Sequence, residues 1–186
     1  QDIVNLKDNE IFVGPYMSFF PDSSNKIVFA DILSGRYDQN FSPSSSNFIR
    51  LSPPNSNYWL KCVIRNTSDF NKTWLIESLV FEVDSITYFI PDSHGKYQEA
   101  TSGYGHNFLN RKIEHKNLNS LIDLNLGEEK TVYIKIVNHR PIDIGFVIKS
   151  VSRFLQYSLK EYYFLGGFYG IILIIVLTNL FLFLII

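Results

Sequence analysis

The chain has 186 residues, with 17 basic and 18 acidic side chains and a formal net charge of −1. This near-neutral balance argues against a nucleic-acid partner, which would need a basic patch. The single cysteine, Cys62, excludes an internal disulfide framework and fits a small core residue. Every charge lies at or before Glu161, so a polar block of ~160 residues precedes an uncharged end.

The chain begins at Gln1, with neither an initiator methionine nor an apolar leader. Such a start is expected after removal of a secretory signal, although an expression product would look the same.

Short runs rich in β-branched and aromatic residues then follow at a spacing of roughly 10–14 residues, separated by Pro, Gly, Asn and Asp. Strands are predicted, in chain order, at residues 26–30, 57–66, 73–81, 84–90, 118–126, 131–137 and 142–148. This spacing predicts an all-β sandwich or barrel rather than βαβ units. The Ser-, Pro- and Asn-rich stretch 34–57 is expected to form a long loop over the sandwich, with a disordered linker as the alternative.

Residues 164–186 read FLGGFYGIILIIVLTNLFLFLII, without one charge. As a helix this run is roughly 34 Å long, enough to cross a ~30 Å hydrocarbon core. We therefore expect three parts: an extracytoplasmic β-sandwich at 1–150, a juxtamembrane connection at 151–163 and a transmembrane helix at 164–186. The lipid bilayer is then the first predicted partner.

The apolar run also has features of a helix that packs against others. Gly166 and Gly170 form a small-xxx-small pair, which lets helices approach closely. Asn179 would gain from a hydrogen-bond partner on another helix. Together they predict that this helix belongs to a bundle.

No catalytic constellation is evident. Asp92, Ser93 and His94 contain the residue types of a triad, but Pro91 to Gly95 reads as a turn. The four histidines lack the spacing of metal motifs, and no glycine-rich loop leads into a helix to bind phosphate. We expect no enzymatic activity, no metal and no cofactor.

We expect the sandwich to bind a ligand, because such folds present aromatic and polar side chains on a sheet face or at loop tips. Tyr97, Tyr104 and Arg111 are the first candidates, since they lie in or beside predicted loops. Trp59 and Arg65, within a predicted strand, complete the candidate set.

Four segments resemble a bacterial receptor family. They are Tyr58-Trp59-Leu60-Lys61 with the turn at 65–68; the strand from Asp84 with its hairpin at Asp92–Gly95; Ser102-Gly103-Tyr104-Gly105 leading to Arg111; and the run from Glu161 through Gly166 and Gly170 to Phe183. Together they resemble extracellular region type 2 of the seven-transmembrane receptors with diverse intracellular signalling modules (7TMR-DISM). Lys61 stands where that family usually has arginine, which removes a bidentate carboxylate contact.

The resemblance implies a jelly-roll-like β-sandwich, similar to carbohydrate-binding modules, that senses a small ligand such as a sugar. It also implies residues 1–163 outside the bacterial inner membrane, in the periplasm or beyond, followed by further transmembrane helices and a cytoplasmic signalling domain. One alternative is a membrane-tethered carbohydrate- or protein-binding module without a signalling role. Another is an assembly module that binds a protein through an exposed sheet face.

Overall fold

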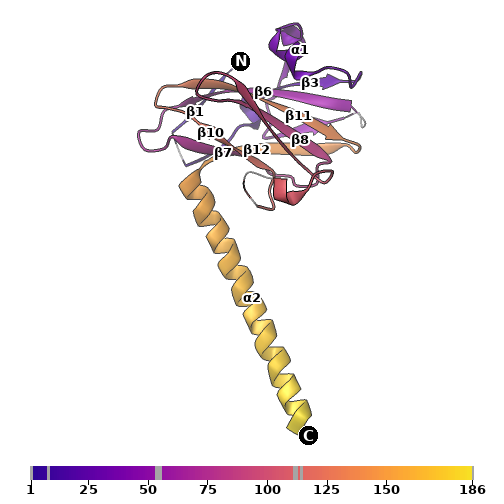
Figure 1. The fold of residues 1–186 in the computed structure, drawn as a ribbon, viewed down its shortest axis with the longest axis vertical. Helices are drawn as coiled ribbons and strands as arrows, with labels where there is room; N and C mark the ends of the chain where they lie inside the picture. Colours follow the sequence, from indigo (N-terminus) through magenta and orange to yellow (C-terminus); the bar gives the residue numbers. More distant parts are fainter. Residues whose placement is uncertain (1, 8, 53–55, 111–112, 114, 186) are drawn as a thin grey trace. The chain divides into compact units, whose positions relative to one another are not determined.

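The computed structural model describes residues 2–7, 9–52, 56–110, 113 and 115–185. They form two compact units, residues 1–150 and 151–186. The first unit holds two β-sheets in separate layers and the second is one long helix (Figure 1).

The larger sheet has the strand order β4-β3-β6-β11-β8-β9, and β1 pairs in parallel with one end of β6. Its strands are β1 (Ile3–Leu6), β3 (Ser18–Asp22), β4 (Ser42–Pro43), β6 (Ser56–Asn66), β8 (Ser85–Pro91), β9 (Tyr97–Ser102) and β11 (Glu129–Asn138). All its other pairings are antiparallel, as in hairpin-built sandwiches.

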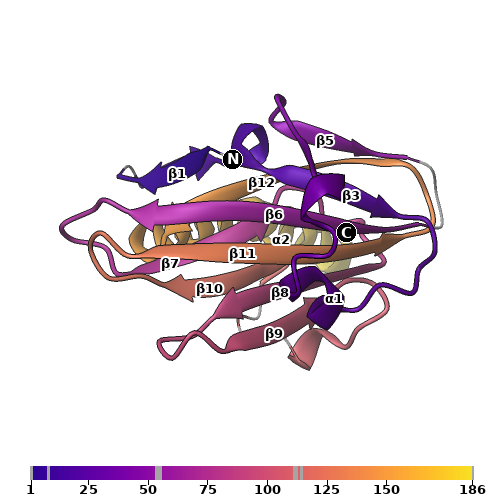
Figure 2. The ribbon, with the colours of Figure 1, turned by 90° about the horizontal axis from the view of Figure 1, so that it is seen from above.

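The smaller sheet has the order β10-β7-β12-β2, and β5 pairs with the other end of β12. Its strands are β2 (Glu10–Phe12), β5 (Phe48–Leu51), β7 (Thr73–Ser78), β10 (Asn119–Asp123) and β12 (Ile142–Ser150). The short helices are η1 (Gly14–Tyr16), α1 (Phe29–Leu33), η2 (Asp38–Asn40) and η3 (Phe108–Asn110). Figure 2 shows α1 over the larger sheet, near β8 and β11.

Alternation along the long strands builds the main core between the sheets. In β6 one side chain in two enters this core: Tyr58, Leu60, Cys62 and Ile64. The intervening side chains, from Trp59 to Arg65, lie on the outer face, because successive strand residues point to opposite sides. Burial raises the pKa of the Cys62 thiol to about 12, so it stays protonated at neutral pH.

The all-β sandwich followed by an apolar helix is confirmed, as are the strands predicted from residue 57 onward. The strand predicted at 26–30 is wrong, because Phe29 begins the helix α1. There Phe29 and Ile32, three positions apart, point to one aromatic cluster, a helical spacing. The predicted loop at 34–57 contains two short strands, β4 and β5. Strands β1, β2, β3 and β9 were not predicted.

Gly103 fixes the turn after β9. Its φ is +133°, and an added Cβ would lie 2.5 Å from the Asp84 carbonyl oxygen. We expect Gly103→Ala to lower the free energy of unfolding by about 2–3 kcal/mol, because alanine meets both strain and a backbone clash. Urea unfolding followed by tryptophan fluorescence measures this. The matched control is Gly105→Ala, whose Cβ would meet nothing closer than 3.5 Å; equal losses in both variants would contradict the expectation.

The second unit is α2 (Val151–Ile185), 35 residues and long and apolar enough to cross a membrane. It therefore includes residues 151–163 and the uncharged run as far as Ile185. An added Cβ at Gly166 or Gly170 would meet nothing within 4 Å. The Asn179 amide donates to the Ile175 carbonyl at 2.8 Å, so one amide donor is satisfied within the helix. Packing of these positions against another helix stays a prediction.

Candidate functional site

The outer face of the larger sheet carries an aromatic cluster. Its buried members are Phe20, Ile27, Ile32, Trp59, Phe89 and Tyr133, with Phe29, Tyr37, Phe41 and Tyr97 packed against them. Strand register explains the gathering: Phe20 pairs with Trp59 across β3 and β6, and Phe89 pairs with Tyr133 across β8 and β11. Residues far apart in the sequence thus form one aromatic surface.

Helix α1 covers this surface through Phe29. The Phe29 ring stacks on Phe89 with centroids 4.0 Å apart and planes at 15°, and lies 6.2 Å from Trp59. It also meets the edges of Tyr97 and Tyr133 at 5.0 and 5.7 Å. Such offset and edge arrangements are favourable for aromatic rings.

Two lysines accompany the aromatic cluster. Lys135 Nζ lies 5.3 Å from the Trp59 ring centroid, and Lys61 Nζ lies 5.8 Å from that of Tyr133. Both distances are within the range of cation–π attraction. Lys61 also forms an ion pair with Asp38, at 3.3 Å.

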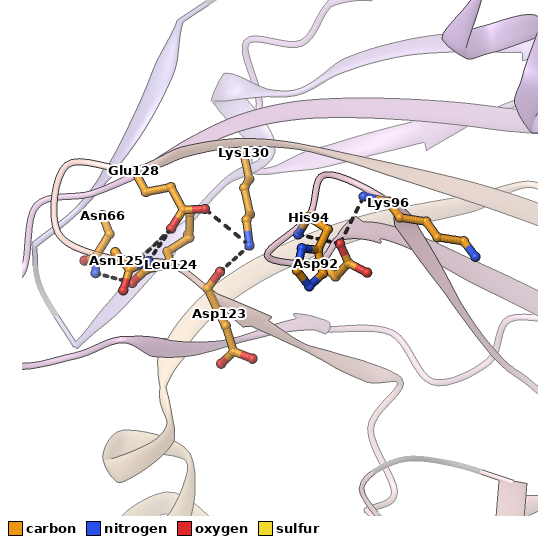
Figure 3. Close-up of polar contacts among 9 residues, drawn as sticks. All are labelled: Asn66, Asp92, His94, Lys96, Asp123, Leu124, Asn125, Glu128 and Lys130. Carbon is orange, nitrogen blue, oxygen red and sulfur yellow. Dashed lines mark hydrogen bonds and ion pairs between the residues drawn. The ribbon is translucent and has the colours of Figure 1, made fainter.

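A groove of about 610 Å³ lies at the sandwich side where the edge strands β9 and β10 meet. Its apolar lining consists of Ile90, Pro91, Ala100, Leu121 and Leu124. Its polar lining comes from Lys72, Asp92, Ser93, Gln98, Ser120, Asp123, Asn125, Glu128 and Lys130. Figure 3 shows the two polar groups that border it, one from the Asp92–Lys96 turn and one from the 123–130 loop.

Asp92 is held by the turn that it begins. Its Oδ1 accepts hydrogen bonds from the backbone N–H groups of His94 at 2.8 Å and Lys96 at 3.0 Å. Its Oδ2 accepts one from the Gln98 amide at 3.1 Å. The His94 N–H, and then Gln98, lower the pKa of Asp92, which is therefore ionised at neutral pH. The sequence reading of this segment as a turn is confirmed.

The opposite side of the groove is organised by Lys130, whose side chain is almost fully buried. Lys130 Nζ donates to the Asp123 carbonyl at 2.7 Å and lies 3.5 Å from Glu128 Oε1 (Figure 3). Glu128 Oε2 accepts from the Asn125 backbone N–H at 2.8 Å, which lowers the pKa of Glu128, and Lys130 adds to this. Thr73 Oγ1 donates to Asp123 Oδ1 at 2.8 Å. The groove thus presents ionised carboxylates in fixed positions.

The sequence-predicted binding residues are dispersed. Trp59 and Tyr97 come together in the aromatic cluster, under Phe29. Arg65 lies on the same sheet face, where its Nε is 2.6 Å from Glu129 Oε1. Tyr104 is 68% exposed, in the turn at the far end of β9 from Tyr97. Arg111 lies outside the described residues.

None of the four that the structure describes, Trp59, Arg65, Tyr97 and Tyr104, lines the groove. Of the residues that line it, Pro91, Asp92 and Ser93 belong to the segment that the sequence predicts as a turn. Asp92, Gln98 and Asp123 lie at or next to the ends of three different strands. No periodic pattern in the sequence predicts that they lie close together. The available signal was weak: several hydrogen-bonding residues cluster in the two turns that flank β9 and β10.

Histidines occupy the other end of the β8–β9 hairpin. His139 Nδ1 lies 2.6 Å from Asp84 Oδ2, and His106 Nε2 lies 2.9 Å from Ser85 Oγ. The His139 backbone N–H, followed by its ring, lowers the pKa of Asp84. Among the described residues, no group of three His, Cys, Asp or Glu side chains is placed to hold a metal ion.

The fold and the groove define a class: a β-sandwich domain with a polar cleft, followed by a candidate membrane helix. The model of one family, 7TMR-DISM extracellular 2, matches residues 14–150. The chain belongs to this family of receptor extracellular domains.

No curated protein sequence matches the chain. Solved structures with similar folds include the A domain of epithelial adhesin 9 from Candida glabrata, in complex with Galb1-4GlcNAc, at 10% identity and a TM-score of 0.36. The match covers 71% of this chain and 79% of the adhesin domain. A β-glucuronidase from Bacteroides uniformis matches at 12% identity and a TM-score of 0.43, over 75% of this chain and 18% of the enzyme. These distant likenesses concern the fold alone.

Proposed function

We propose that the chain is the extracytoplasmic ligand-sensing part of a bacterial membrane signalling receptor, without enzymatic activity of its own. Residues 1–150 bind a small hydroxylated molecule, such as a carbohydrate, in the groove between β9 and β10. Helix α2 anchors the domain in the inner membrane and packs, through Gly166 and Gly170, against the following helices of the receptor. Family membership supports the receptor role, and the groove carries the assignment of the site.

The groove suits a small polar ligand by size and by chemistry. Its volume of about 610 Å³ falls within the roughly 300–1,000 Å³ of ordinary small-molecule sites. Ionised Asp92 and Glu128 are hydrogen-bond acceptors, while Gln98 and Ser120 can both donate and accept. Such groups match the hydroxyl groups of a sugar, and the apolar lining residues match the C–H face of its ring.

The groove is connected to the start of α2 through the smaller sheet. Asp123 of β10 pairs with Thr73 of β7, and the neighbouring Trp74 pairs with Ser150, the last residue of β12. A ligand that displaces β10 therefore acts on β12 through one intervening strand. It changes the signalling state only if the two states bind it with different affinity.

The test is a titration of the full chain in lipid nanodiscs with a panel of neutral mono- and disaccharides. We expect Gln98→Ala and Asp123→Asn each to weaken binding by about 10-fold or more, as loss of a hydrogen bond involving a charged group does. The matched control is Glu99→Ala, next to Gln98 in β9 but on the other face of the strand. Absence of binding to any sugar in the panel, or equal affinity in all three variants, would contradict the site.

Hydrogen exchange distinguishes a sensor from the alternative, a membrane-tethered carbohydrate- or protein-binding module. A sensor predicts that saturating ligand changes the exchange rates of residues 146–150 in β12 as well as those in the groove. A tethered module without a signalling role predicts protection in the groove alone.

A further inference from the structure

Residues 26–41, here called the strap, cross the outer face of the larger sheet and end on the aromatic cluster. The strap contributes Phe29, Ile32, Tyr37 and Phe41 to that cluster, together with Ile27. The sheet beneath supplies Phe20, Trp59, Phe89 and Tyr133. Two layers of rings therefore face each other, one on continuous strands and one on a segment whose only α-helical turn is five residues long.

The sheet beneath the strap is arranged in two rows across the strands. One row runs Lys61, Tyr133, Phe89 across β6, β11 and β8. The other runs Phe20, Trp59, Lys135 across β3, β6 and β11. Each row places a lysine beside flat aromatic surface, so the platform combines ring stacking with positive charge.

The strap contacts both the aromatic surface and a lysine of this platform. The Phe29 ring lies flat on Phe89 at 4.0 Å, and the Asp38 carboxylate lies 3.3 Å from Lys61 Nζ. The strap thus presents a flat six-membered ring and a carboxylate to the two outer positions of one row, since Phe89 and Lys61 flank Tyr133. An oligomer of uronate residues offers the same two features, the ring of one residue and the carboxylate of a neighbouring one.

The buried indole of Trp59 adds a hydrogen-bond donor to the platform. Trp59 is fully buried beneath the strap, and its Nε1–H has no hydrogen-bond partner among the described residues. A buried donor without an acceptor costs free energy, so most buried indoles have a partner. A ligand hydroxyl at the edge of the Trp59 ring would supply the missing acceptor.

We propose that the outer face of the larger sheet is a second binding site, specific for an acidic saccharide of the uronate type, and that the strap closes it. In the closed state Phe29 and Asp38 stand where a sugar ring and the carboxylate of a neighbouring sugar residue bind. In the open state the ring stacks on Phe89 and Trp59, and Lys61 pairs with the ligand carboxylate. The apparent dissociation constant equals the intrinsic one divided by the fraction of open molecules, so weakening the strap tightens binding.

The probe is trigalacturonate, with the neutral trisaccharide maltotriose as its counterpart, titrated against the full chain in lipid nanodiscs by calorimetry. We expect Phe29→Ala and Asp38→Asn each to tighten trigalacturonate binding about 10-fold, because each removes a contact that holds the strap closed. Asp38 is exposed, so its variant keeps the fold even if Phe29→Ala does not. Lys61→Met is expected to abolish the preference for the acidic over the neutral sugar.

The matched control is Leu33→Ala, a substitution in the same helix at a side chain that is 47% exposed and outside the aromatic cluster. It is expected to leave the affinity for trigalacturonate unchanged. Equal affinities for trigalacturonate and maltotriose in Asp38→Asn would overturn the proposal, as would equal trigalacturonate affinities in the wild type, Phe29→Ala and Asp38→Asn.

These experiments can contradict either of the two proposed sites without contradicting the other. If Asp123→Asn abolishes trigalacturonate binding and Lys61→Met leaves it unchanged, the acidic sugar binds in the groove. This outcome would overturn the second site alone. A groove that binds no neutral sugar overturns the first site and leaves the strap experiment intact.

Discussion

Replacement of Glu77 by leucine is expected to lower the free energy of unfolding by about 3–5 kcal/mol, because it leaves a buried lysine without its main partner. Glu77 is fully buried on the outer side of the smaller sheet, and its Oε2 lies 2.9 Å from Lys149 Nζ. The Lys149 side chain is only 7% exposed, and Glu10 is a second carboxylate at 3.7 Å. The Asn117 amide donates to the other Glu77 oxygen.

Denaturation of the sandwich by urea, followed by tryptophan fluorescence, measures this effect. The double variant Glu77→Leu, Lys149→Met is expected to recover most of the lost free energy of unfolding. It removes both charges, whereas Glu77→Leu alone leaves the buried Lys149 charge without the Glu77 carboxylate. The matched control is Asp143→Asn, which breaks the exposed pair between Arg50 and Asp143 at 2.7 Å and should cost at most about 1 kcal/mol. A double variant less stable than Glu77→Leu would contradict this account.

Asn66→Ala is expected to cost about 2–4 kcal/mol, because three buried polar contacts are lost at once. The Asn66 amide donates to the carbonyls of Asn71 at 2.7 Å and Leu124 at 2.9 Å, and its Oδ1 accepts from the Ser68 N–H at 3.0 Å. Its backbone also bonds to Gly127 and Glu128. Asn66 therefore joins the loop after β6 to the loop after β10, beside the groove (Figure 3).

The same unfolding experiment tests Asn66, with Asn66→Asp as a second variant. Aspartate keeps the shape but aims a carboxylate at two carbonyl oxygens, so we expect a loss at least as large as for alanine. The control is Asn5→Ala at an exposed position of β1, with an expected change within about 0.5 kcal/mol. Stability of Asn66→Asp equal to that of the wild type would show that the amide donors contribute nothing.

The parts of the fold that sequence reasoning found are those with strong local signals. Strands β6, β11 and β12 are nine to eleven residues long, and apolar residues recur along them at alternate positions. They can therefore be predicted as strands without knowledge of the surrounding structure. β9 reads YQEATS and lies at a sheet edge, where one face is solvated and apolar alternation is not required. At Phe29, β-propensity was overridden by the aromatic cluster beneath it, because propensity depends on what a side chain packs against.

The candidate sites were harder to predict, for a topological reason. Trp59 and Tyr97 contact the same ring because β6, β11, β8 and β9 are neighbours in that order, which no local pattern of the sequence encodes. The groove likewise depends on β9 and β10 lying at the same side of two different sheets. Residue type identifies aromatic and arginine side chains as candidate ligand contacts. Strand order determines which of these side chains lie next to one another.

Strands β1 and β2 show that the region matched by the family and the folded domain begin at different residues. The family match starts at residue 14, yet β1 and β2 precede it and each completes a sheet. Val4 and Leu6 of β1 are buried in the main core, and β2 covers residues 147–149 of β12. A chain shortened to the matched region would present two unpaired strand edges, the usual template for edge-to-edge aggregation. The unit of homology in this domain is therefore smaller than the unit of folding.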